Sequence, residues 1–197
     1  MKIERLVLSE YQSNCYIAES QGEAVIIDPG APSPEILERV ANTTVKYIIN
    51  THAHPDHILG NSFLKERLKV PVVLPKLDRE IYRYVAGVEP EPDDQLMGEN
   101  DLLVFGEAKL EVLNMPGHSP GHVMLLERKE RLIFVGDLIF AGSIGRTDIP
   151  GGSDKEMRKS LSRLVNLEGD WWLYPGHGPE TTLSQERWTN PFLLELR

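Results

Sequence analysis

Cysteine is nearly absent from this sequence: Cys15 is the only one among 197 residues. A single thiol excludes an intramolecular disulfide framework and a metal site built from cysteines. Long apolar runs are also missing, since no stretch approaches the roughly 18 residues that a membrane-spanning helix needs. The opening segment, MKIERLVLSEYQ, mixes charged with apolar residues and is unlike a secretory signal. We therefore expect a cytoplasmic protein with no membrane partner.

Basic residues are in the minority, with 21 lysines and arginines against 30 aspartates and glutamates, which gives a net charge of −9. Such an acidic surface repels phosphate backbones unless basic side chains cluster locally. The most basic stretch, RLKVPVVLPKLDR, is interrupted by apolar residues throughout. We therefore expect no nucleic-acid partner, and the sequence gives no indication of the oligomeric state.

The remaining composition is that of an ordinary globular protein, with 41% hydrophobic and 26% charged residues. The length favours a single domain over residues 1–197. Runs rich in β-branched residues predict strands at 3–8, 15–19, 24–27, 45–49, 71–74, 102–105, 109–113, 122–127, 131–135 and 171–174. Amphipathic segments predict helices at 34–41, 57–68, 76–86 and 154–167, and the acidic stretch 87–101 is expected to be a surface loop. This alternation predicts a layered α/β fold with helices on both faces of the sheet core.

Three of the six histidines fall within one short motif, THAHPDH, directly after a predicted strand. His52 and His54 are two residues apart on an extended segment, so their side chains point the same way. Asp56 and His57 follow where the chain turns and are able to reach a second point nearby. Imidazole and carboxylate are the ligands that borderline divalent metals prefer. The alternative, that these residues only cap the turn or fill space in it, does not explain why four ligand-type residues lie together at a strand end.

Three further candidate ligands lie in glycine-bounded loops after predicted strands. His118 lies in NMPGHSPGH and His177 lies in YPGHGP. Asp137 ends the apolar run RLIFVGD, where a carboxylate needs a cation nearby. Together these residues supply the additional nitrogen ligands and the bridging carboxylate that a two-metal site requires.

These motifs resemble the metal-binding motifs of the metallo-β-lactamase-fold hydrolases. Within that superfamily, NCY at 14–16, GRTDIPGG at 145–152 and the ending PGHGPETTL…ERWTNPFL resemble the short bacterial glyoxalase II-like branch, the hydroxyacylglutathione hydrolases. The resemblance implies a single-domain, four-layer αββα sandwich with the site at one edge of the sheets. It also implies a small-molecule thioester substrate, such as S-D-lactoylglutathione.

The resemblance further implies a role for each ligand. The first metal is expected on His52, His54 and His118, the second on Asp56, His57 and His177, with Asp137 bridging the two. Two divalent cations, zinc or alternatively iron or manganese, would lower the pKa of a shared water, and the resulting hydroxide would attack the thioester carbonyl. Asp56 is expected to act in catalysis as well, by orienting that hydroxide.

Three other residues are expected to support the site. His122, four residues after His118, is expected to orient a ligand. Asp28 is given the same role, with a turn carboxylate that caps Pro29–Gly30 as the alternative. By resemblance, Arg146 contacts the glutathione part of the substrate, and the alternative is a surface ion pair with Asp148.

Two competing functions remain open on the sequence. Persulfide dioxygenases share the scaffold and bind one iron, for which His52, His118 and Asp137 would suffice. A non-catalytic, zinc-stabilised module is the other possibility, although structural zinc sites are usually rich in cysteine. Only 20 residues follow His177. We therefore do not expect the C-terminal glutathione-binding region of long glyoxalase II enzymes, and the thiol part of the substrate stays open.

Overall fold

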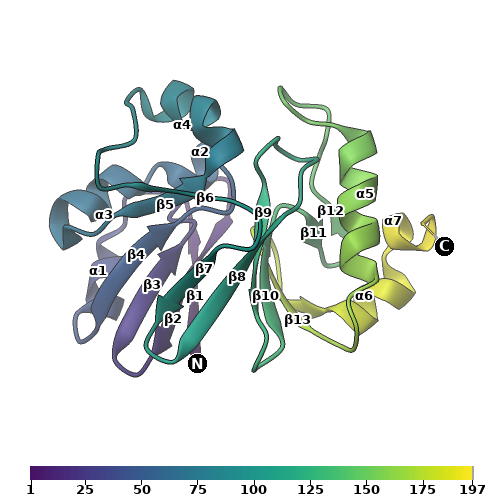
Figure 1. Ribbon diagram of the computed structural model, residues 1–197, viewed down its shortest axis with the longest axis horizontal. Helices are drawn as coiled ribbons and strands as arrows, with labels where there is room; N and C mark the ends of the chain where they lie inside the picture. The colour runs from purple at the N-terminus through teal and green to yellow at the C-terminus, as the bar shows by residue number, and fades with distance from the viewer. Residues whose placement is uncertain (197) are drawn as a thin grey trace.

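Two six-stranded sheets form the centre of the molecule in the computed structural model, which describes residues 1–196 (Figure 1). Sheet A consists, in spatial order, of β1 (Lys2–Leu8), β2 (Ser13–Ser20), β3 (Glu23–Ile27), β4 (Thr44–Ile49), β5 (Val72–Pro75) and β6 (Gln95–Met97). Sheet B consists of β14 (Thr181–Thr182), β13 (Trp172–Pro175), β10 (Leu132–Gly136), β9 (Val123–Glu127), β8 (Ala108–Asn114) and β7 (Leu102–Phe105). A small hairpin joins β11 (Ile139–Phe140) to β12 (Ser143–Ile144).

Helices cover the outer face of each sheet (Figure 1). On sheet A lie α1 (Pro34–Val40), α2 (Pro55–Ile58), α3 (Asn61–Leu68), the 3₁₀ turn η1 (Lys76–Asp78) and α4 (Arg79–Ala86). On sheet B lie α5 (Asp154–Val165), α6 (Leu183–Thr189) and α7 (Pro191–Leu194). The four-layer αββα sandwich is therefore confirmed. No helix within residues 1–196 combines the length and the apolar character needed to cross a membrane.

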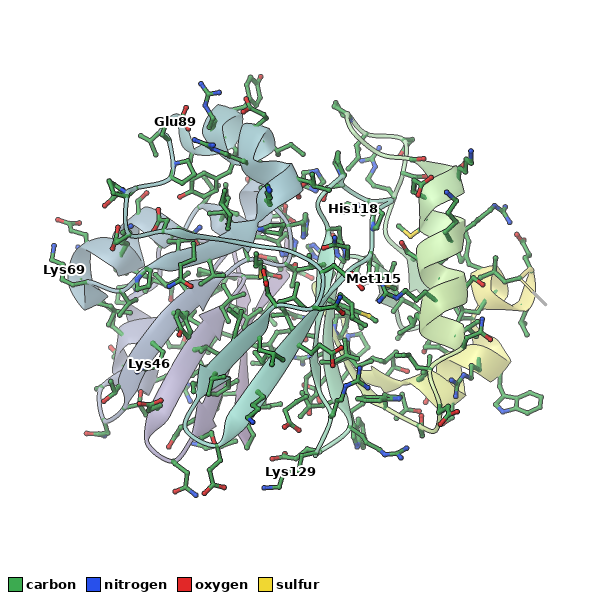
Figure 2. All side chains as sticks on the ribbon, viewed as in Figure 1. Lys46, Lys69, Glu89, Met115, His118 and Lys129 are labelled. Atoms are coloured by element: carbon green, nitrogen blue, oxygen red, sulfur yellow. The ribbon has the colours of Figure 1, made fainter. Side chains whose placement is uncertain are left out.

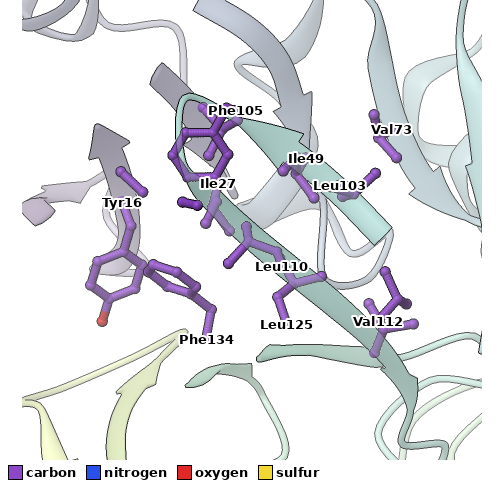
Figure 3. Close-up of a cluster of buried hydrophobic side chains, with 14 of the residues drawn as sticks. Tyr16, Ile27, Ile49, Val73, Leu103, Phe105, Leu110, Val112, Leu125 and Phe134 are labelled. Carbon is purple, nitrogen blue, oxygen red and sulfur yellow. The ribbon is translucent and has the colours of Figure 1, made fainter. Parts of the chain in front are cut away.

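Alternation along the strands explains why both faces of each sheet are apolar. In β3, Ala24 and Ile26 pack under the helices, whereas Val25 and Ile27 face sheet B. The core between the sheets, shown in Figure 3, includes the rings of Tyr16 and Phe134, whose centroids are 5.4 Å apart. Burial on both faces requires nearly continuous apolar runs, which is why these strands are recognisable in the sequence.

One predicted helix, 57–68, is wrong in its bounds. The chain forms two helices instead, α2 and α3, which are separated at Leu59 and Gly60. Gly60 donates its backbone N–H to the carbonyl of Pro29, and a Cβ at position 60 would lie 2.6 Å from that oxygen. This close contact between segments interrupts the helix, and the local pattern does not reveal it.

The stretch 87–101 is not only a surface loop, because it contains β6, which pairs in parallel with β5. Next to this strand, Asp94 accepts a hydrogen bond from the backbone N–H of Val72 and is paired with Lys65. These contacts tie the acidic segment to the sheet edge. The elements β11, β12, β14 and α7 are likewise absent from the sequence-based expectation, since each has only two to four residues, too few for a periodic pattern. The helix α6 is also absent from it, although α6 has the same length as α1.

Candidate metal centre

The candidate ligands and the supporting residue Asp28 lie in segments that follow strand ends. Asp28 follows β3, His52 follows β4, and His118 lies in the loop after β8. Asp137 follows β10 and His177 follows β13. Although they come from distant parts of the sequence, these segments meet at one edge of the two sheets, where His118 is labelled in Figure 2. Binding sites in sheet proteins commonly form beyond strand ends in this way.

The first cluster contains His52, His54 and His118, whose ligand atoms all lie within 4.8 Å of one another. Nδ1 of His54 is 2.8 Å from Nε2 of His118. His52 is fully buried, while His54, which precedes the first residue of α2, is half-buried. Three imidazoles thus converge on one point.

The second cluster contains Asp56, His57 and His177, again with ligand atoms within 4.8 Å. Oδ2 of Asp56 lies 3.1 Å from Nε2 of His177 and 3.6 Å from Nε2 of His57. Helix α2 begins at Pro55, which fixes the backbone of the first turn and aims Asp56 and His57 toward the loop of His177.

Asp137 lies within reach of both clusters. Its Oδ2 is 3.5 Å from Nε2 of His118 in the first cluster and 3.6 Å from Nε2 of His177 in the second. Its Oδ1 is 3.5 Å from Nε2 of His57. A single carboxylate therefore faces the ligand atoms of both groups.

The hydrogen-bond partners of two histidines, His118 and His52, leave their Nε2 atoms unprotonated. Nδ1 of His118 lies 2.8 Å from the carbonyl oxygen of Arg146, which only accepts, so Nδ1 carries the proton. Thr51 donates its hydroxyl to Asp28, so its oxygen accepts from Nδ1 of His52, 3.1 Å away. Nδ1 of His57 lies 3.2 Å from Asp28 without forming a hydrogen bond, so its tautomer is not fixed in this way. The fixed tautomers of His118 and His52 are typical of histidines that bind metal through Nε2.

Burial and charge shift the pKa values of the site in opposite directions. Burial and the neighbouring histidines hold the pKa of His52 well below its usual range and lower that of His54 to about 4, so both rings are neutral. Burial alone would lower the pKa of His57, but Asp137 and Asp28 raise it to about 9. The surroundings of His57 therefore favour a positive charge.

The carboxylate of Asp56 is ionised. Burial would raise its pKa, but the hydrogen bond from His177 and the charges of His57 and His177 lower it to about 2. Conversely, burial would lower the pKa of His177, while Asp56 and Asp137 raise it.

The residues present fit divalent cations. Among the described residues, His52 Nε2, His57 Nε2 and Asp137 Oδ1 are buried and have no hydrogen-bond partner. Buried polar atoms of this kind are rare unless a ligand satisfies them. Three of them facing one another, within a set of imidazoles and carboxylates, point to divalent metal ions.

Glycine is required where the loops approach the cluster most closely. A Cβ on Gly176 would lie 2.1 Å from Oδ1 of Asp137, and one on Gly136 would lie 2.6 Å from Oγ1 of Thr51. The glycine of the PGHG motif thus lets the backbone pack directly against a candidate ligand, and that of the GD motif lets it pack against Thr51, which contacts His52.

Of the three supporting residues, Asp28 and His122 contact candidate ligands, and Arg146 lines the cavity beside them. Asp28 contacts His57 and accepts hydrogen bonds from both the backbone and the hydroxyl of Thr51. His122 accepts the backbone N–H of Asp137 at 3.0 Å through Nε2. The guanidinium of Arg146 is exposed and makes two hydrogen bonds, of 2.8 and 3.0 Å, to Asp148, the ion pair considered above as the alternative.

Asp78, a fully buried carboxylate at the junction of η1 and α4, is a further residue of the site that is not among the sequence-based candidates. It accepts hydrogen bonds from the backbone N–H groups of Ala53 (3.1 Å) and Gly121 (2.6 Å) and from the hydroxyl of Ser119 (2.6 Å). It thereby joins the loop of His52 and His54 to the loop of His118. Burial raises its pKa against these three bonds. Within the amphipathic segment 76–86, nothing local marks this role.

Asn14, within the NCY motif, holds the loop of His177. Its buried amide donates to the carbonyls of Pro175 (2.8 Å) and Gly178 (2.9 Å), on either side of that histidine. The hydroxyl of Tyr16 also donates to Pro175, at 2.8 Å.

A cavity of about 840 Å³ opens onto the two clusters. His54, Asp56, His118, Asp137 and His177 line its floor. Its sides come from α4 and from the segment 140–150 before α5, the two elements that flank the top of the molecule in Figure 1. A small molecule is therefore able to reach both clusters from solvent.

The chain is similar in sequence and fold to several known proteins. The hydroxyacylglutathione hydrolase GloC of Haemophilus influenzae is 31% identical over 98% of both chains. A crystal structure of TTHA1623 in a di-iron-bound form superimposes with a TM-score of 0.84 at 38% identity, covering 96% of this chain and 100% of that one. The structure of ETHE1 from Myxococcus xanthus gives a TM-score of 0.82 at 28% identity, covering 97% and 84%. A family model of the metallo-beta-lactamase superfamily matches residues 8–177, and the chain belongs to this superfamily.

Proposed function

We propose that the protein is a two-metal hydrolase of acyl thioesters, with S-D-lactoylglutathione among its substrates. The observation that carries the proposal is the position of Asp137, which lies within 3.6 Å of nitrogen atoms in both ligand clusters. The similarity to the Haemophilus enzyme supports the choice of a thioester. Zinc is the proposed metal, with iron as the alternative because one relative is described in a di-iron form.

His52, His54 and His118 would hold one ion, and Asp56, His57 and His177 the other, with Asp137 shared. When bound, the ions lower the pKa of water to near neutrality and polarise the substrate carbonyl. Asp56 stays ionised at neutral pH because its pKa is about 2, so it orients the attacking water by accepting a hydrogen bond. A thiolate leaves readily because its conjugate acid, the thiol, has a pKa of only about 8.5. The nitrogen anion released from an amide would be far more basic and would need a proton donor, so we assign no dedicated general acid here.

Arg146 is the proposed contact for an anionic thiol part of the substrate. It lines the cavity, and its guanidinium is exposed. A substrate carboxylate would replace Asp148 as its partner. Replacing Arg146 by alanine is then expected to raise KM for S-D-lactoylglutathione and leave kcat nearly unchanged, while a neutral thioester keeps its KM.

Persulfide oxidation is the second candidate, because ETHE1 is among the similar structures and His118 and Asp137 lie together. The test is the rate of hydrolysis of S-D-lactoylglutathione by purified protein, before chelation, after chelation, and after zinc or iron is restored. Metal-dependent release of glutathione supports the hydrolase. Oxygen uptake with glutathione persulfide, without thioester cleavage, would contradict the hydrolase proposal and support a persulfide dioxygenase instead.

A further inference from the structure

The side walls of the cavity differ in character from its floor. Helix α4 contributes Ile81, Tyr84 and Val85 to one wall. The facing wall consists mainly of Phe140, Ile144, Ile149 and Pro150. The substrate therefore passes between apolar surfaces before its reacting bond meets the ligand clusters.

Tyr84 is a large aromatic residue that lines the cavity and is nevertheless almost fully exposed to solvent. Its exposed fraction is 90%, although Ile81 and Val85 on the same helix pack against the core beneath. Covering exposed aromatic surface with a ligand removes it from water, which makes the free energy of binding more favourable. Tyr84 is thus placed to be covered by whatever enters the cavity.

Few polar groups accompany these walls. Beyond the two ligand clusters, Asp137 and Arg146, the charged or hydroxyl side chains that line the cavity are Glu80, Ser143 and the phenol of Tyr84. Glu80 is paired with Arg83. Among the described residues, Arg146, the proposed contact for the thiol part, is thus the one charged group outside the metal centre that this cavity offers to a substrate, and it lies on the wall that faces α4. The thiol parts of biological thioesters carry amides and charges that need hydrogen-bond partners, whereas an aliphatic acyl chain needs none.

From these walls we infer that the acyl group of the preferred substrate is an aliphatic chain longer than lactoyl, which lies between α4 and the segment 149–150. This inference rests on the proposed thioester hydrolysis and specifies its substrate class. The cavity of about 840 Å³ falls within the range of sites that enclose ligands of this size. Each methylene buried between the walls is expected to strengthen binding about fourfold, from about 0.8 kcal/mol per group.

The test keeps the thiol constant and varies the acyl chain. Values of kcat/KM are measured for the lactoyl, butanoyl and hexanoyl thioesters of glutathione with the zinc-loaded protein. In parallel, calorimetry gives the affinities of the free acids lactate, butanoate and hexanoate. We expect hexanoate, which has two more methylenes, to bind about 15-fold more tightly than butanoate, and kcat/KM to follow the same order.

Two variants test the walls, Tyr84→Ser and Ile149→Ser, with Leu102→Ser as the control. Leu102 is 58% exposed at the start of β7 and does not line the cavity. The wall variants are expected to reduce the preference for hexanoate at least threefold, and the control to retain it. Equal binding of lactate and hexanoate, or an unchanged preference in both wall variants, would overturn the inference. If no thioester is cleaved while the chain-length preference of the acids persists, the proposed hydrolysis fails and the apolar acyl site stands.

Discussion

The carboxylate of Asp78 accepts the backbone N–H of Ala53, the residue between His52 and His54. The same carboxylate accepts hydrogen bonds from Ser119 and Gly121, which lie beyond His118 in a different sheet's loop. One buried side chain that is not itself a candidate ligand therefore ties the loop of His52 and His54 to the loop of His118, and so fixes the positions of the three histidines relative to one another.

Replacing Asp78 by asparagine should weaken metal binding. An amide has one acceptor oxygen and turns its NH2 group toward donors, so part of the network is lost while the volume stays the same. We expect a metal affinity about 10- to 100-fold lower, measured by competition with a chelator. Asp101→Asn is the matched control, because Asp101 is exposed and accepts a single backbone bond from Gly98. Equal affinities in the two variants would rule out this role.

Replacing Asn14 by alanine should loosen the loop of His177. The carbonyl groups of Pro175 and Gly178 both lose the amide of Asn14 as their hydrogen-bond donor. The hydroxyl of Tyr16 still donates to Pro175, so the carbonyl of Gly178 is left without this side-chain donor. The free energy of unfolding should fall by about 1–3 kcal/mol in urea denaturation. Asn166→Ala serves for comparison, since the exposed amide of Asn166 makes one bond, to Ser162. A loss no larger than in that variant would contradict the assignment.

Gly176→Ala should disturb the shared carboxylate directly. The new Cβ would lie 2.1 Å from Oδ1 of Asp137 and 2.8 Å from Cε1 of His57, so at least one of the two must move. We expect the affinity for the second metal to fall more than tenfold in calorimetric titration. Gly98→Ala is the control, because nothing lies within 4 Å of a Cβ at that position.

His177→Ala separates the two candidate reactions. In a two-metal hydrolase it removes one ligand of the second ion, so metal analysis should give one bound ion per chain instead of two. Thioester hydrolysis should then fall at least about 100-fold. A dioxygenase that binds a single iron through His52, His118 and Asp137 would keep its iron content and its oxygen uptake in this variant, and that result would exclude the two-metal hydrolase.

The layered fold and the ligand clusters were predictable because their signals are local. Strands buried on both faces, such as β3, are short apolar runs, and four candidate ligands lie within six positions of one motif. The sequence also offered both alternatives for Arg146, and the pair with Asp148 is present.

Other features depend on contacts between distant segments. Asp78 is 25 residues from Ala53 and 43 from Gly121, and its own surroundings look like an ordinary amphipathic helix. The break at Gly60 arises from the carbonyl of Pro29, and β6 has only three residues. The apolar walls of the cavity combine α4 with residues 140–150, a pairing that periodicity does not indicate.

Each sheet is built from its own stretch of chain, because sheet A is complete at Met97 and sheet B begins at Leu102. The candidate ligands divide at the same place, with His52, His54, Asp56 and His57 before it and His118, Asp137 and His177 after it. Ion binding is consequently linked thermodynamically to the docking of two halves. A substitution in the core between the sheets, at Phe105 or Phe134 for example, would lower metal affinity although it changes no ligand. The affinity for the ion therefore reports the stability of the contact between the two sheets.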